Sequence, residues 1–148
     1  MATGVFITHS RAETEAVAES LAKDITGGVI ALNGDLGAGK TCFTAGLAKG
    51  LGYLGDVNSP TFAIVNEYKG GRKDVYHFDM YRINGWEDLY TTGYFEYLES
   101  GEVLVIEWSE NIENALPDNT VRVTINQGKN PNQRIITIEG AENENFSS

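Results

Sequence analysis

Residues 34–41, Gly-Asp-Leu-Gly-Ala-Gly-Lys-Thr, match the phosphate-binding loop pattern Gly-x-x-x-x-Gly-Lys-Thr. The apolar run Val29-Ile30-Ala31-Leu32 directly before this loop predicts a buried strand. After the loop, Phe43, Leu47 and Leu51 recur at i, i+4 and i+8, as on one face of a helix. Strand, loop and helix therefore follow in the order that phosphate binding requires, and the sequence predicts an α/β fold.

The chemistry of the loop predicts that it binds nucleotide phosphates. Its glycines let backbone N–H groups surround phosphate oxygens, and the following helix directs its positive N-terminal end to the same anion. The Lys40 ammonium is expected to reach the β- and γ-phosphates, and the Thr41 hydroxyl to bind Mg²⁺. The residues expected to bind the nucleotide here are Asp35, Leu36, Gly37, Ala38, Gly39, Lys40 and Thr41.

Length and composition predict a single globular domain over residues 1–140, followed by a polar tail at 141–148. No apolar stretch approaches the roughly 20 residues that span a bilayer, and the N-terminus lacks the pattern of a secretory signal. The single cysteine, Cys42, cannot form an internal disulfide and is expected to be a small buried residue. We therefore expect a cytoplasmic protein that does not associate with membranes.

The charge balance disfavours direct binding of nucleic acid by this chain alone. Eleven basic residues against 21 acidic ones give a formal net charge of −10, and the basic residues are scattered along the sequence. Affinity for RNA or DNA depends largely on Lys and Arg side chains that neutralise phosphates. An acidic surface instead suits a protein partner that carries a basic patch.

The remaining elements complete one α/β domain with a mixed sheet. Ser10 to Glu13 form a capping box, which predicts a helix that ends at Gly27-Gly28. Short helices are expected between Trp86 and Ser100, with a break at Gly93. Other strands are predicted at residues 5–8, in one hairpin over 62–78, at 103–106, and in a second hairpin over 121–138.

Two acidic residues follow predicted strands and are candidates for the hydrolytic chemistry. Glu107 comes directly after the apolar run Val103–Ile106, and Asp79 ends the strand that contains His77. In an open α/β sheet the ligand lies at the carboxyl ends of the strands. An ATPase needs an acid near Mg²⁺ and a group that orients the attacking water. The alternative for each acid is a solvated carboxylate at the end of a strand.

Other candidates depend on weaker signals. Thr61 lies in a Ser-Pro-Thr loop, and such loops can sense a γ-phosphate, although a simple turn is an equal alternative. From its position next to Glu107, Trp108 is expected either to pack in the core or to form a wall of the ligand site, and packing is favoured. His77 is expected to make a structural hydrogen bond within a strand. Arg82 is a candidate to pair with Asp79 or with a partner protein, and Arg134 is a candidate neighbour of the nucleotide.

Four motifs together resemble the bacterial TsaE (YjeE) family, the ATPase of tRNA threonylcarbamoyladenosine biosynthesis. They are Gly-Asp-Leu-Gly-Ala-Gly-Lys-Thr at 34–41, Ser-Pro-Thr-Phe at 59–62, His-Phe-Asp-Met-Tyr-Arg at 77–82 and Ile-Glu-Trp at 106–108. The resemblance covers roughly residues 5–140. It implies a P-loop NTPase-like three-layer fold with a mixed parallel and antiparallel central sheet, and a weak intrinsic ATPase that uses ATP and Mg²⁺.

The resemblance also implies partners and roles for individual residues. The chain would bind the TsaB–TsaD pair, and ATP hydrolysis would reset that complex between turnovers, while TsaD transfers the threonylcarbamoyl group to adenosine 37 of tRNA. Lys40 and Thr41 would hold phosphate and Mg²⁺, and Glu107 would be the second acid beside Mg²⁺. Asp79 would orient the attacking water. Thr61 would belong to a switch-like loop, and Trp108 would contact the nucleotide.

Three other functions are alternatives to the ATPase. A small-molecule kinase usually adds a lid with several arginines, whereas the five arginines here are spread over the whole chain. A GTPase would need the guanine-reading Asn-Lys-x-Asp sequence, which does not occur. A nucleotide-sensing module without catalysis stays open, because hydrolysis could depend on the partner.

Overall fold

The computed structural model describes residues 3–35, 39–58 and 65–140, so the predicted tail at 141–148 lies outside the described residues. Within them, seven strands form one sheet in the order β1-β7-β6-β2-β5-β4-β3. The strands are β1 (Gly4–Thr8), β2 (Gly28–Gly34), β3 (Val65–Tyr68), β4 (Val75–Asp79), β5 (Val103–Glu107), β6 (Val121–Gln127) and β7 (Arg134–Glu139). The helices are α1 (Arg11–Ala22), α2 (Lys40–Gly50), α3 (Trp86–Thr91), α4 (Tyr94–Glu99) and the 3₁₀ segment η1 (Ser109–Ala115).

The sheet is mixed, as predicted. Strands β6, β2, β5 and β4 run parallel to one another, and the antiparallel strands β1, β7 and β3 lie toward the two edges. Both predicted hairpins are found, one from β3 and β4 and the other from β6 and β7. The parallel centre brings the carboxyl ends of β2, β5 and β4 to the same edge of the sheet.

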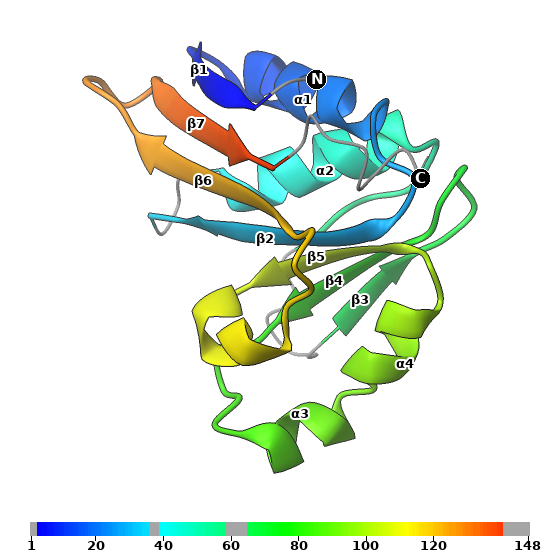
Figure 1. The fold of residues 1–148 in the computed structure, drawn as a ribbon. Coiled ribbons are helices and arrows are strands. Elements are labelled where there is room, and N and C mark those ends of the chain that lie inside the picture. Colours follow the sequence, from blue (N-terminus) through cyan, green and yellow to red (C-terminus); the bar gives the residue numbers. More distant parts are fainter. Residues whose placement is uncertain (1–2, 36–38, 59–64, 141–148) are drawn as a thin grey trace.

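Helices cover both faces of the sheet, which makes the predicted three-layer fold (Figure 1). Alternate residues of one strand pack against the helices on opposite faces of the sheet. Ile30 and Leu32 of β2 pack in the hydrophobic cluster with α1 and α2, whereas Val29 packs in the cluster with α3 and α4. Strand β5 divides in the same way, with Val105 in the first cluster and Ile106 in the second. The apolar runs are continuous because each strand is buried on both faces.

Helix α1 begins as predicted but ends earlier than predicted. The Ser10 hydroxyl accepts a hydrogen bond from the Glu13 N–H at 3.1 Å, which is the expected N-cap. The helix ends at Ala22 and not at Gly27-Gly28, so that prediction is wrong. The Arg72 guanidinium, from the β3–β4 connection, donates to the carbonyls of Ala22 at 2.7 Å and Ile25 at 2.9 Å. A distant side chain thus satisfies the carbonyls that a longer helix would have used.

Helices α1 and α2 pack closely because α2 has a glycine at their contact. A Cβ atom on Gly46 would lie 2.5 Å from the Glu15 carbonyl oxygen and 2.8 Å from its Cα. No side chain fits in that space, so Gly46 allows the two backbones to approach. This packing holds α2, and with it the N-terminal end of the helix, against the sheet.

The opposite layer matches the prediction for residues 86–100. Gly93 separates α3 from α4 and adopts a φ of 81°, a left-handed conformation that favours glycine. Tyr94 and Leu89 are buried beneath the two helices. In the described part of the chain, no helix has both the length and the apolar character needed to cross a bilayer.

Candidate functional site

The two predicted acidic residues lie side by side at the carboxyl edge of the sheet. Asp79 is the last residue of β4, Glu107 is the last residue of β5, and the two are direct partners in the parallel register. Paired residues of neighbouring strands point to the same face of a sheet. That face is the one covered by α1 and α2, because Val105, two residues before Glu107, packs in their cluster. Both carboxylates therefore lie on the side of the sheet that carries α2.

The described parts of the phosphate-binding loop join β2 to α2 at this edge. Gly34 ends β2, and Gly39 caps α2 with a left-handed φ of 104°. The predicted contacts Leu36, Gly37 and Ala38 lie outside the described residues.

Asp35 anchors the start of the loop to β6. Its backbone N–H donates to the Ile125 carbonyl at 3.2 Å, and its carboxylate accepts from the Gln127 N–H at 3.3 Å. The position of the loop therefore depends on β6 as well as on β2.

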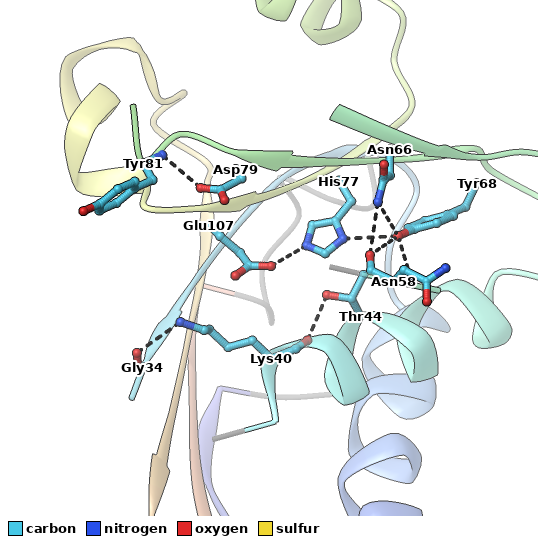
Figure 2. A network of polar contacts seen from close by, with 10 residues as sticks. All are labelled: Gly34, Lys40, Thr44, Asn58, Asn66, Tyr68, His77, Asp79, Tyr81 and Glu107. Atoms are coloured by element: carbon cyan, nitrogen blue, oxygen red, sulfur yellow. Dashed lines mark hydrogen bonds and ion pairs between the residues drawn. The ribbon is translucent and has the colours of Figure 1, made fainter. Parts of the chain in front are cut away.

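Lys40 is the first residue of α2, and its side chain folds back over the loop. The ammonium donates to the Gly34 carbonyl oxygen at 3.2 Å, so the positive charge lies next to the last residue of β2 (Figure 2). The half-buried Thr41 follows on the same first turn. Both side chains therefore begin at the N-terminal end of α2, where a helix binds anions.

A buried histidine holds the Glu107 carboxylate. His77 is fully buried in β4, and its Nε2 lies 2.6 Å from Glu107 Oε2 (Figure 2). An ionised carboxylate only accepts hydrogen bonds, so Nε2 carries the hydrogen in this pair. The predicted structural hydrogen bond of His77 is thus found, and it fixes the direction of the Glu107 side chain.

This contact continues through Tyr68 to the loop that follows α2. The Tyr68 hydroxyl lies 3.4 Å from His77 Nδ1 and donates to the Asn58 carbonyl at 2.8 Å. Burial raises the pKa of Tyr68, so the hydroxyl stays protonated as a donor. Asn58 directly precedes the segment that contains Thr61, which lies outside the described residues. Sequence reasoning missed Tyr68 and Asn58, because their contact joins β3 to the loop after α2 and leaves no local pattern.

Asp79 is held by the turn that follows its strand. Its Oδ1 accepts a hydrogen bond from the Tyr81 N–H at 2.9 Å. No ion pair between Asp79 and Arg82 occurs among the described residues, and Arg82 is exposed, so the suggested pairing is absent there. The second Asp79 carboxylate oxygen points to the side of the sheet on which Glu107 and Lys40 lie (Figure 2).

The expectation that Trp108 packs in the core is wrong. The side chain is 43% exposed, and its ring meets that of Tyr81 edge-on with centroids 4.8 Å apart. Its φ of 60° is the only positive value at a non-glycine residue in the described ranges. A left-handed conformation costs an ordinary residue roughly 1–2 kcal/mol, and such strain is concentrated at functional sites. The strand-end position of Trp108 therefore points to a surface role and not to packing.

A small hollow lies on the other side of Gly39. Its volume is about 110 Å³, and its lining includes Arg11, Cys42 and Arg134. Arg134 thus lines the same hollow as Gly39, and its guanidinium donates to the Pro131 carbonyl at 2.7 Å. Cys42 is buried, as predicted, and burial raises the pKa of its thiol, which suits a packing role.

Comparison with known proteins identifies the family of the chain. A family model described as "Threonylcarbamoyl adenosine biosynthesis protein TsaE" matches residues 8–136. The chain belongs to the TsaE family. The tRNA threonylcarbamoyladenosine biosynthesis protein TsaE of Bacillus subtilis (strain 168) is 42% identical over 133 residues, which cover 88% of this chain and 82% of that protein. Its Haemophilus influenzae namesake is 43% identical over 97 residues, or 66% of this chain and 61% of that protein.

A solved structure shows the same fold as this TsaE-family chain. The crystal structure of Bacillus subtilis YdiB matches with a TM-score of 0.77 at 34% sequence identity, covering 99% of this chain and 90% of that chain. The fold and the family predicted from four motifs are therefore confirmed. The described residues of three of these motifs, 34–41, 77–82 and 106–108, meet at one edge of the sheet, while 59–62 lies outside the described residues.

Proposed function

We propose that the chain is a P-loop ATPase that hydrolyses Mg²⁺–ATP to ADP and phosphate. This activity would support the TsaB–TsaD complex, which makes threonylcarbamoyladenosine at position 37 of tRNA. The observation that carries the proposal is the convergence of Lys40, Asp79 and Glu107 at the carboxyl edge of β2, β4 and β5. A cation for phosphate and two carboxylates for the metal and water are the groups that phosphoryl transfer to water requires.

The oxygen donors at this edge fit Mg²⁺. Mg²⁺ prefers oxygen ligands and is usually held by one or two carboxylates together with substrate phosphates. The Thr41 hydroxyl and the Glu107 carboxylate are the protein groups that would hold it. Among the described residues no cluster of three His, Cys, Asp or Glu side chains forms a metal centre of its own. When bound, Mg²⁺ would neutralise charge on the β- and γ-phosphates.

Each described side chain has a distinct role in the proposed reaction. The Lys40 ammonium would leave the Gly34 carbonyl, 3.2 Å away, and bind the β- and γ-phosphates. The Asp79 carboxylate would orient the attacking water toward the γ-phosphorus, opposite the bond to the ADP that leaves. His77 holds Glu107 and prevents its carboxylate from turning away from the metal side. The nucleotide contacts proposed for Leu36, Gly37, Ala38, Thr61 and Trp108 rest on the motifs and on family membership.

The hydrolytic cycle is proposed to act on protein partners in the cytoplasm. TsaD and TsaB are the proposed partners because the chain belongs to the TsaE family. The net charge of −10 disfavours direct contact with tRNA and favours a protein surface rich in Lys and Arg. Hydrolysis by the isolated chain is expected to be slow, with the pair controlling the rate.

The decisive experiment measures phosphate release from ATP and from GTP, with and without the TsaB–TsaD pair. We expect slow release from ATP alone, little from GTP, and a clear change in rate when the pair is added. Release that is insensitive to the pair, together with phosphorylation of a metabolite, would replace the ATPase by a kinase. Nucleotide binding without release under any condition would leave a sensing module.

A further inference from the structure

An exposed aromatic patch lies on the layer of the molecule that faces away from α1 and α2. It consists of Trp86 and Tyr90 of α3 and Phe95 of α4. The rings touch one another, with centroids 5.0 Å apart for Tyr90 and Phe95 and 6.2 Å for Trp86 and Phe95. Trp86 is nevertheless 52% exposed and Tyr90 64% exposed. Large aromatic side chains exposed together mark interaction sites, and Trp and Tyr are the residues that most often dominate binding energy.

A groove of about 440 Å³ adjoins this patch. One wall is the segment from Ile83 to Trp86, and the other is the part of η1 from Glu110 to Ala115. The buried side chains of Leu89 and Ile112 form part of the lining. An apolar side chain of a partner therefore has a place to insert next to the aromatic patch.

The segment that carries the patch is strongly acidic, although Arg122 of β6 pairs with Glu113 of the groove lining at 2.6 Å. Between Ile83 and Asp118 the sequence has nine Asp or Glu residues and no Lys, Arg or His. The other 12 acidic residues of the chain are nearly balanced by its 11 basic residues, so this segment carries almost all of the net charge of −10. Glu87, Glu96 and Glu110 are exposed there and take part in no ion pair among the described residues.

The groove also lies next to the catalytic edge along the chain. The rings of Tyr81 and Trp108 touch. Tyr81 comes two residues after Asp79, Trp108 directly follows Glu107, and both lead into the walls of the groove. The Asn111 amide joins these walls by donating to the Met80 carbonyl at 2.8 Å. A molecule bound in the groove would therefore contact segments that continue directly into the catalytic acids.

We propose that the aromatic patch and the groove form the docking surface for a protein partner that presents an apolar side chain surrounded by Lys and Arg. The aromatic patch supplies apolar area for the partner's apolar side chain. The excess of acidic residues supplies negative charge that attracts the partner's Lys and Arg. The proposal rests on the proposed function in one respect, because it takes the TsaB–TsaD pair as that partner. Docking there sets the position of Tyr81 and Trp108, which is how the partner controls the rate of hydrolysis.

The test measures the affinity of purified chain variants for the TsaB–TsaD pair in the presence of Mg²⁺–ATP. The double variant Trp86→Ala/Tyr90→Ala removes the aromatic patch, and Leu54→Ala is its control, since Leu54 is 98% exposed and lies outside this layer. We expect the double variant to bind at least about 30-fold more weakly and the control to bind as the wild type does. Affinity for Mg²⁺–ATP in the absence of the pair should not change.

A charge reversal gives a second measurement that does not alter the aromatic rings. Glu87→Lys/Glu110→Lys should slow association with the pair and make the association rate less dependent on salt concentration. Asp56→Lys, at an exposed loop position, should have little effect.

If the wild type binds the pair and both patch variants bind equally well, the docking surface is wrong and the proposed function stands. If the wild type neither binds nor responds to the pair, the partner assignment fails and the docking proposal fails with it. If the double variant instead changes only self-association, a second copy of the chain covers the patch and the proposal is overturned.

Discussion

Replacing His77 with phenylalanine tests whether the buried imidazole positions Glu107. Phenylalanine keeps an aromatic ring in the core but has no N–H group, so Glu107 loses the partner that lies 2.6 Å from its Oε2. A hydrogen bond to a charged group contributes about 1.5–3 kcal/mol. The Glu107 side chain is 13% exposed, so water replaces part of that contribution and we expect a loss of about 2 kcal/mol. For a domain of this size the loss lowers Tm by about 4–8 °C.

The effect on hydrolysis should exceed the effect on binding. Without His77 the Glu107 carboxylate rotates, and a misplacement of about 1 Å in an active site can cost a hundredfold in rate. We expect kcat for phosphate release to fall at least about tenfold while the affinity for Mg²⁺–ATP changes by less than about threefold. Calorimetric unfolding and single-turnover phosphate release measure the two quantities.

Tyr68→Phe is the matched control for this variant. It removes the hydroxyl that donates to the Asn58 carbonyl at 2.8 Å but leaves the contact between His77 and Glu107 intact. We expect a stability loss of about 1 kcal/mol with little change in kcat. A His77→Phe protein with wild-type Tm and rate, or a Tyr68→Phe protein with an equal loss of kcat, would refute the positioning role.

Three further variants test the remaining structural conclusions. Lys40→Ala should reduce Mg²⁺–ATP affinity at least about tenfold in calorimetric titration, and wild-type affinity would remove Lys40 from the site. Glu107→Gln keeps the size of the side chain, so it should lower the rate of phosphate release far more than nucleotide affinity; an unchanged rate would exclude Glu107 from the mechanism. Gly46→Ala places a Cβ 2.5 Å from the Glu15 carbonyl oxygen and should destabilise the protein by about 1–3 kcal/mol, which a normal Tm would contradict.

The central strands were predictable because their burial leaves a local signal. The apolar runs of β2 and β5 are continuous, and a strand with both faces covered needs no polar residue within the run. The capping box at Ser10 is equally local, since the donor and acceptor lie three residues apart. The placement of Asp79 and Glu107 at strand ends also followed from such runs. Their direct pairing did not, because it depends on which strands become neighbours in the sheet.

The missed features all depend on residues far away in the sequence. Helix α1 ends at Ala22, whose carbonyl accepts from Arg72, and no pattern near residue 22 indicates that contact. Trp108 was expected in the core because it follows a buried strand, but its left-handed backbone turns the ring outward to meet Tyr81. Tyr68 reaches His77 only through the register of the β3–β4 hairpin.

The alternation of β4 and β5 places the proposed nucleotide site and the proposed docking surface on opposite faces of the sheet. His77 and Asp79 of β4 point to the face with α2, whereas Phe78 and Met80 pack under the opposite layer. The chain crosses the carboxyl edge directly after each acid and continues into the walls of the groove, so the same short segments border both sites. Such segments can transmit a partner's contact without any movement of the sheet. Under the proposed docking, control of hydrolysis would require only small displacements of Tyr81 and Trp108, which the exposure of both side chains permits.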